Sequence, residues 1–210
     1  MNAQTRRLRL DGGAGAIEAV LDEPAEGVGE PRGVAVIAHP HPLFGGTMDN
    51  KVVQTLARAF TQCGWRAVRF NFRGVGASEG VHDDGRGEAD DLLAVVRQAA
   101  PDGPLALAGF SFGAFVASRG IAGLWAQRDL RKLVLVGTAA ARFDVAALPA
   151  EVHERTLVVH GEQDDTVPLA AVMDWARPQS LPVTVVPGGG HFFHGQLPLL
   201  KSLVVRHLQS

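Results

Sequence analysis

Apolar residues fall into six short, nearly continuous runs along the chain. Each run is rich in valine, leucine and alanine, with few polar residues inside it. This pattern is typical of strands that are buried on both faces of a parallel sheet. The runs lie at residues 34–38, 67–70, 105–108, 133–136, 157–159 and 183–186.

Apolar residues three and four positions apart predict helices between these runs. Gly64 is suited to end the first helix, and Pro168 is suited to begin a later one. Strands that alternate with helices predict right-handed crossovers and a doubly wound, mostly parallel α/β sheet with helices on both faces. The helical positions lie within residues 52–60, 92–100, 169–176 and 200–207.

The N-terminal region predicts an antiparallel hairpin. Residues 8–10 and 16–21 flank the turn sequence Asp11-Gly12-Gly13. Residues 23–32 then mix Glu, Pro and Gly, which is typical of a surface loop. No repeat divides the remainder, so we expect residues 1–210 to form a single domain with one large core.

The composition limits the possible chemistry. The chain has 20 basic and 22 acidic side chains, a net charge of −2 and a pI near 6.4. Such a chain offers no basic surface for a phosphate backbone, so we expect no nucleic-acid partner. The single cysteine, Cys63, excludes an intrachain disulfide and cysteine-built metal clusters, and it is interpreted as a small buried residue at a helix end. The absence of tyrosine excludes a tyrosine acid, base or nucleophile.

No segment indicates secretion or a membrane span. Residues 1–13 contain arginines but no apolar stretch behind them. The most apolar stretch, residues 105–126, contains Ser111, Ser118 and Arg119, and it is better explained as a strand, a turn and a helix. We therefore expect a cytoplasmic protein with no membrane partner.

A candidate catalytic motif follows the third apolar run. Residues 109–113 have the sequence G-x-S-x-G with Ser111 at the centre, and a helical pattern follows over residues 114–124. Between a strand and a helix this motif makes a sharp turn that exposes the serine hydroxyl at the helix N-terminus. The strain of about 1–3 kcal/mol is tolerated mainly where the position has a function. A glycine-rich turn without function is the alternative interpretation, because short motifs also occur by chance.

A base and an acid that could serve such a serine lie further along the chain. The fifth apolar run is followed by a loop with two adjacent carboxylates, Asp164 and Asp165. The sixth run is followed by a glycine-rich loop that ends in His191. Ligands of such sheets bind beyond the carboxyl ends of the strands, so we expect these side chains to meet Ser111 there.

The chain resembles the α/β-hydrolase superfamily, and specifically the small lidless bacterial serine hydrolases similar to dienelactone-hydrolase-like and short-chain esterase proteins. The motifs span most of the chain in the order found in that family. One departure is the elbow residue, because dienelactone hydrolases carry cysteine where this chain has Ser111. The motifs are AHPHPLFGGTMDN at 38–50, FNFRGVGASEG at 70–80, GFSFGA at 109–114, HGEQDDTVP at 160–168 and GGGHFFHG at 188–195.

The resemblance implies a role for each of three residues. Ser111 would be the nucleophile, His191 the base and Asp164 the acid. The family pattern places the acid three residues after the glycine of the His-Gly loop, which favours Asp164. The alternatives are Asp165 and then Asp144 for the acid, and His194 for the base, although His194 is expected to begin the final helix.

Acyl transfer also needs donors for the negative charge that develops on the carbonyl oxygen. The backbone N–H of Phe112, directly after the nucleophile, is expected to be one. The second is expected from the loop after the first apolar run. Proline has no N–H, so Pro40 and Pro42 are excluded, and His41 is favoured over Leu43.

Two other motifs are interpreted as structural. His39 and His41 form an H-x-H pair, but no further ligand follows in that loop, so we expect bonds to the loop backbone and no metal. Residues 73–80 lack the third glycine of a dinucleotide-binding loop, and Arg73 is expected to be an internal hydrogen-bond donor. We expect no cofactor.

The predicted site is open, because the residues between the fourth and fifth runs are too few for a helical cap. An open apolar pocket favours a carboxylesterase-like enzyme with small ester or thioester substrates. A thioesterase or a small peptidase could use the same triad, and a non-catalytic binding protein could use the same fold. Oligomeric state and natural substrate are not predicted. Candidate pocket residues are Leu43, Phe44, Phe112, Phe192 and Phe193.

Overall fold

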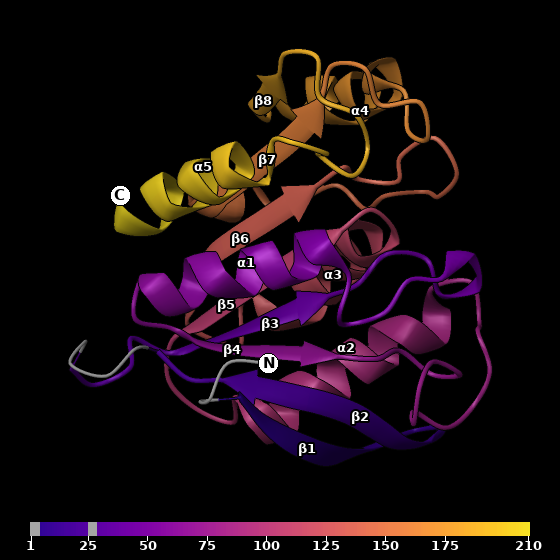
Figure 1. Ribbon diagram of the computed structural model, residues 1–210, viewed down its shortest axis with the longest axis vertical. Coiled ribbons are helices and arrows are strands. Elements are labelled where there is room, and N and C mark those ends of the chain that lie inside the picture. Colours follow the sequence, from indigo (N-terminus) through magenta and orange to yellow (C-terminus); the bar gives the residue numbers. More distant parts are fainter. Residues whose placement is uncertain (1–4, 25–28) are drawn as a thin grey trace.

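The computed structural model describes residues 5–24 and 29–210. These residues form one eight-stranded sheet in the order β1-β2-β4-β3-β5-β6-β7-β8 (Figure 1). Strands β3 to β8 are mutually parallel, and β2 joins them antiparallel to β4. The strands are β1 Thr5–Gly12, β2 Gly15–Asp22, β3 Val34–Ala38, β4 Arg66–Phe70, β5 Leu105–Phe110, β6 Leu130–Val136, β7 Thr156–Gly161 and β8 Val183–Val186. The predicted doubly wound sheet is therefore confirmed.

The N-terminal hairpin is also confirmed, but its turn begins two residues later than expected and shares only Gly13 with the predicted turn. Gly12 pairs with Gly15, so the two turn residues are Gly13 and Ala14. Asp11 and Gly12 belong to β1 instead. The physical reason is the long antiparallel register between β1 and β2, which continues to the last possible pair and leaves a tight two-residue loop.

The central strand β5 shows why the apolar runs are nearly continuous. Every residue of β5 is buried, and alternate residues face opposite sides of the sheet. Leu105 and Leu107 pack into the cluster that holds α2 and α3, whereas Ala106 and Ala108 pack into the cluster beneath α1 and α5. A strand with helices on both faces therefore has no polar position.

Helices cover both faces of the sheet (Figure 1). Helices α1 and α5 share one apolar cluster with the sheet, and α2, α3 and α4 share the other. The connection between β6 and β7 contains only the short 3-10 helix η2, Ala150–Arg155, so no cap covers the described sheet edge. The helices are α1 Lys51–Gln62, α2 Arg86–Ala99, α3 Phe112–Leu124, α4 Leu169–Ala176 and α5 Leu197–Gln209.

The ends of the helices follow local chemistry. The Asn50 side chain caps α1 by accepting the Val52 N–H at 2.9 Å. Gly64, just beyond the C-cap residue Cys63, has a φ of 83°, which is a left-handed conformation that glycine adopts without strain. Cys63 is buried, as predicted.

The final helix begins later than predicted. His194 precedes it, and α5 starts at Leu197 after the left-handed Gly195. Pro198 lies in the first turn, where a missing N–H costs nothing because that group would have no intrahelical acceptor. Among residues 5–24 and 29–210, no helix is long and apolar enough to cross a membrane.

Candidate active site

Ser111 lies on a sharp turn between β5 and α3. Its backbone has φ 57° and ψ −114°, a region that residues with a side chain rarely adopt. The turn is tightly packed, because a Cβ atom on Gly109 would clash with the Gly113 carbonyl and one on Gly113 would clash with the Ala38 carbonyl. Both glycines of the motif are therefore required by close backbone contacts.

A continuous chain of hydrogen bonds links Ser111, His191 and Asp164. The Ser111 Oγ lies 3.0 Å from His191 Nε2, and His191 Nδ1 lies 2.7 Å from Asp164 Oδ2. All three residues are buried. The carboxylate selects the imidazole tautomer with its proton on Nδ1, which leaves Nε2 free to accept the serine proton.

Asp164 is held by its own loop. Its Oδ1 accepts the N–H groups of Thr166 at 3.0 Å and Val167 at 2.7 Å, so Oδ2 remains for His191. Burial alone would raise the pKa of Asp164, but the hydrogen bonds from His191 and from the Val167 N–H together hold the pKa below its usual value. The carboxylate is therefore ionised at neutral pH.

His160 is hydrogen-bonded to the loop that contains Asp164. The side chain is fully buried, and its Nε2–H donates to the Val167 carbonyl at 2.8 Å while lying 3.5 Å from Asp164 Oδ2. Burial lowers the pKa of His160, which keeps the imidazole neutral. His160 thereby ties the end of β7 to the residue whose N–H binds Asp164.

The other candidate acids and base are placed differently. Asp165, Asp144 and His194 are exposed, and none of them takes part in the hydrogen bonds of Ser111 or His191. The structure thus brings together the three residues that the family pattern favoured.

The loop after β3 runs beside Ser111. Leu43 donates its N–H to the His41 Nδ1 at 3.2 Å, so this N–H already has an acceptor within the loop. Phe112 is the first residue of α3, where an N–H has no intrahelical partner. The His41 ring lies 4.9 Å from the Phe112 ring, which places the loop against the start of α3.

His39 anchors the start of this loop. Its Nδ1–H donates to the Pro40 carbonyl at 2.6 Å, and its Nε2 accepts the Phe72 N–H at 3.0 Å. The expected bonding of these loop histidines to backbone groups is therefore confirmed. The bond that Nε2 accepts requires a neutral ring, and burial lowers the pKa of His39 from 6.5 to about 4.

This buried histidine predicts a loss of stability in mild acid. The unfolded chain binds a proton on His39 below pH 6.5, but the folded chain does so only near pH 4, so the stabilisation is present above 6.5 and is lost as the pH falls toward 4. Between pH 7 and pH 5, His39→Gln should lose about 2 kcal/mol less unfolding free energy than the wild type. Urea unfolding followed by tryptophan fluorescence measures both losses. Equal losses in the two proteins would contradict the prediction.

A cavity of about 350 Å³ opens onto Ser111 and His191. Aromatic side chains form much of its wall, and the expected pocket residues Phe44, Phe112 and Phe192 are among them. Sequence reasoning missed the contribution of the loop after β6. The lining residues are Pro40, His41, Phe44, Gly45, Gly46, Asn50, Ser111, Phe112, Ala139, Arg142, Phe143, Thr166, Val167, His191 and Phe192.

Two of the expected pocket residues lie elsewhere. Phe193 is fully buried in the core cluster with α1 and α5, because a φ of 50° at this residue turns the chain inward. Leu43 is 70% exposed and does not line the cavity. Arg142 and Phe143 lie in the loop that follows β6, at the edge of the sheet where ligands of such folds bind, and this general placement is the signal that points to them.

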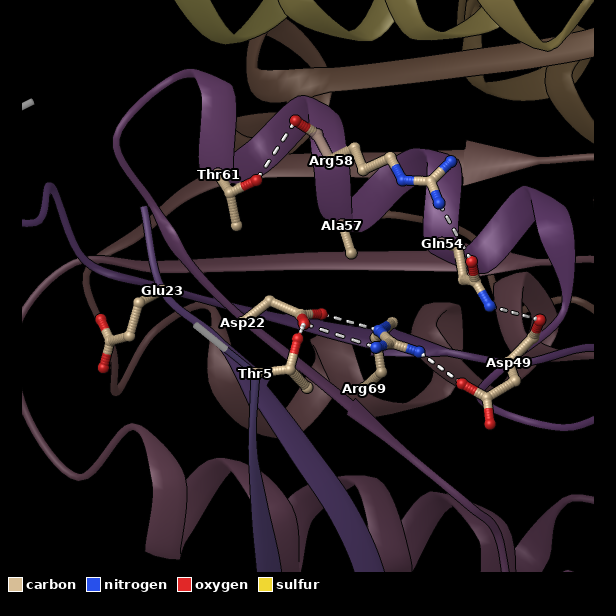
Figure 2. A pocket seen from close by; sticks show the side chains of 9 residues that line it. All are labelled: Thr5, Asp22, Glu23, Asp49, Gln54, Ala57, Arg58, Thr61 and Arg69. Carbon is tan, nitrogen blue, oxygen red and sulfur yellow. Dashed lines mark hydrogen bonds and ion pairs between the residues drawn. The ribbon is translucent and has the colours of Figure 1, made fainter. Parts of the chain in front are cut away.

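Two further features are structural. Arg73 donates to both carboxylate oxygens of the buried Asp91, at 3.0 and 2.8 Å, which confirms the expected internal role. A larger cavity of about 640 Å³ lies beside α1 (Figure 2), and none of its described lining residues is a serine, a cysteine or a histidine. There the Arg69 guanidinium is paired with Asp22 at 2.8 Å and Asp49 at 2.9 Å.

The fold and the elbow serine define a lidless serine hydrolase of the α/β-hydrolase superfamily. The sequence profile of the serine aminopeptidase S33 family matches residues 29–145, which is more than half of the chain. The chain belongs to this family.

Solved structures agree with this assignment. A lidless α/β serine hydrolase from Xanthomonas campestris is 37% identical to this chain, with a TM-score of 0.87. The match covers 100% of this chain and 95% of the Xanthomonas chain. An α/β serine hydrolase homologue from Coxiella burnetii is 38% identical, and the match covers 97% of each chain with a TM-score of 0.83.

One sequence relative matches a part of the chain. An uncharacterized protein of Rickettsia prowazekii is 42% identical over 88 residues, which span 40% of this chain and only 37% of that protein.

Proposed function

We propose that this protein is a carboxylesterase-like hydrolase that cleaves small esters with Ser111, His191 and Asp164. The observation that supports the proposal is the chain of hydrogen bonds from Ser111 Oγ through His191 to Asp164. Ser111 and His191 line the aromatic cavity, where a substrate could reach them. Serine becomes a competent nucleophile only when a base removes its proton and a third group orients that base. The cytoplasmic location expected from the sequence stays a prediction.

The first half of the reaction forms an acyl-enzyme. Ser111 Oγ attacks the ester carbonyl carbon while His191 Nε2 takes the hydroxyl proton. His191 then gives this proton to the leaving oxygen, the carbon–oxygen bond breaks, and the alcohol departs. Asp164 stabilises the imidazolium that forms between these two transfers.

The second half restores the enzyme. Water replaces the alcohol, and His191 removes a proton from it as the water oxygen attacks the acyl carbon. The bond to Ser111 Oγ breaks, the serine recovers its proton from His191, and the carboxylic acid leaves. No metal or cofactor is needed to balance either half.

Two backbone N–H groups would hold the oxyanion in both halves. The proposed donors are Phe112, at the start of α3, and His41, because the Leu43 N–H is already bonded to the His41 ring. Each donor of this type contributes about 2.7–4 kcal/mol to the transition state. His41, unlike Leu43, also lines the cavity.

A peptidase activity is the second candidate, and the observation that favours it is the family description of serine aminopeptidase. A panel of nitrophenyl esters, acyl thioesters and aminoacyl anilides, assayed on one preparation, separates the possibilities. We expect the highest kcat/KM for short-chain esters, because the cavity is open and of modest volume. Cleavage of anilides alone would replace the esterase proposal with the peptidase, and turnover of no substrate would support a non-catalytic binding protein.

A further inference from the structure

Arg142 differs from every other residue that lines the catalytic cavity. It carries the only permanently charged side chain among the lining residues that do not belong to the proposed triad. The rest of the wall consists mainly of aromatic, aliphatic and glycine residues together with His41, Asn50 and Thr166. A guanidinium in such a wall is suited to bind an anionic group of a ligand.

The charge of Arg142 has no protein counter-ion within the described residues. No carboxylate there lies within ion-pair distance of Arg142, whereas Arg69 and Arg73 are each paired with aspartate at 2.8 Å. Arg142 instead lies over the Phe44 ring, with its guanidinium carbon 5.5 Å from the ring centre. The planar donor edge of the guanidinium therefore stays available to a carboxylate.

The backbone that carries Arg142 is firmly held. The N–H groups of Arg142 and Phe143 both donate to the Ala139 carbonyl at 3.2 Å, which forms a tight turn after β6. The Phe143 ring then stacks on Phe115 of α3, with ring centres 4.6 Å apart. The turn thus keeps the backbone of Arg142 at the rim of the cavity, so only the side chain has to be ordered when a ligand binds.

Arg142 interacts electrostatically with His41, in the loop that contains the proposed oxyanion donor. Burial is the main cause that lowers the pKa of His41, and the neighbouring His82 and Arg142 side chains lower it further, against smaller opposite effects of Glu88 and Asp84. His41, in turn, lies 4.8 Å from the Phe44 ring that Arg142 covers. This end of the cavity therefore favours negative charge.

The proposed reaction determines which part of the substrate lies at this end. His191 must reach the leaving oxygen, so the alcohol lies beside His191 and Phe192, whose rings are 5.1 Å apart. The acyl chain then extends toward Phe44 and Arg142. We propose that the enzyme prefers half-esters of dicarboxylic acids, with Arg142 binding the free carboxylate of the acyl chain, an inference that rests on the proposed esterase function.

The test compares two esters that differ in charge. One is the mono-para-nitrophenyl ester of glutaric acid, which is an anion at neutral pH, and the other is para-nitrophenyl pentanoate, a neutral ester of the same chain length. The readout is the kcat/KM of the anionic ester divided by the kcat/KM of the neutral ester. The rates measured with the Ser111→Ala protein are subtracted first. Arg119→Gln is the matched control, because Arg119 is also exposed and lies 5.4 Å over a phenylalanine ring, Phe115, but does not line the cavity.

The ratio should fall about fivefold in Arg142→Gln, recover in part in Arg142→Lys and keep the wild-type value in Arg119→Gln. Added salt should lower the wild-type ratio more than the Arg142→Gln ratio. If both esters are cleaved in a Ser111-dependent manner and the ratio is equal in wild type and Arg142→Gln, the inference fails and the esterase function stands. If neither ester is cleaved in that manner, the esterase function itself fails.

Discussion

Replacing Ser111 with alanine should lower kcat/KM for ester hydrolysis by at least about 10³-fold. The substitution removes the hydroxyl oxygen that lies 3.0 Å from His191 Nε2, and no acyl-enzyme can then form. What remains is the weak catalysis that the oxyanion donors and the cavity provide by binding the ester. The fold should be retained, because the Ser111 side chain makes no other hydrogen bond among the described contacts and alanine accepts the same backbone with similar strain.

Steady-state assays with a nitrophenyl ester measure this loss. Ser118→Ala is the matched control, since Ser118 is a buried serine of the helix that follows Ser111, and its hydroxyl donates to the Phe115 carbonyl at 2.7 Å as its single bond among the described residues. Ser118→Ala should keep a rate near that of the wild type. A Ser111→Ala protein that is folded and equally active would show that the chemistry takes place elsewhere.

Replacing Asp164 with asparagine should lower kcat by about 10⁴-fold, the loss typical of this change in a serine triad. The reason lies in the two backbone N–H groups, of Thr166 and Val167, that bind Oδ1. They select the amide oxygen for that position, so the amide NH₂ of asparagine must face His191. His191 would then carry its proton on Nε2 and could not accept one from Ser111.

The adjacent Asp165→Asn variant is the control for this prediction. Asp165 is exposed, and within the described part of the chain its side chain accepts one hydrogen bond, from the Thr166 hydroxyl at 3.3 Å. We expect Asp165→Asn to retain most of the activity. The assignment of the acid would be wrong if Asp165→Asn lost the larger share of kcat, because both variants change the charge of the same loop by the same amount.

The parts of the fold that were predictable from sequence depend on local rules. A buried parallel strand needs a continuous apolar run, and β5 shows this at every residue. The turn at Ser111 needs glycine at 109 and 113, because the surrounding backbone leaves no space for a Cβ. Such requirements are visible in the residue types themselves, so the buried parallel strands and the elbow could be expected from the sequence.

The parts that were not predictable depend on where a side chain points. Phe192 and Phe193 are neighbours of the same type, yet only Phe192 lines the cavity, because the backbone of Phe193 has a φ of 50° and turns its ring into the core. Arg142 was missed because nothing local distinguishes an arginine at a cavity rim from one on a surface. The hairpin turn begins at Gly13 and not at Asp11, because the cross-strand register, rather than turn composition, determines its position.

Covalent labelling measures directly whether Ser111 is an activated nucleophile. A fluorophosphonate reacts with a serine whose proton a neighbouring base removes, and the adduct is located by mass spectrometry of the digested protein. We expect one adduct, on the peptide that contains Ser111, and none in the Ser111→Ala protein. A folded wild-type protein that takes up no label, or takes it up at another serine, would contradict the account.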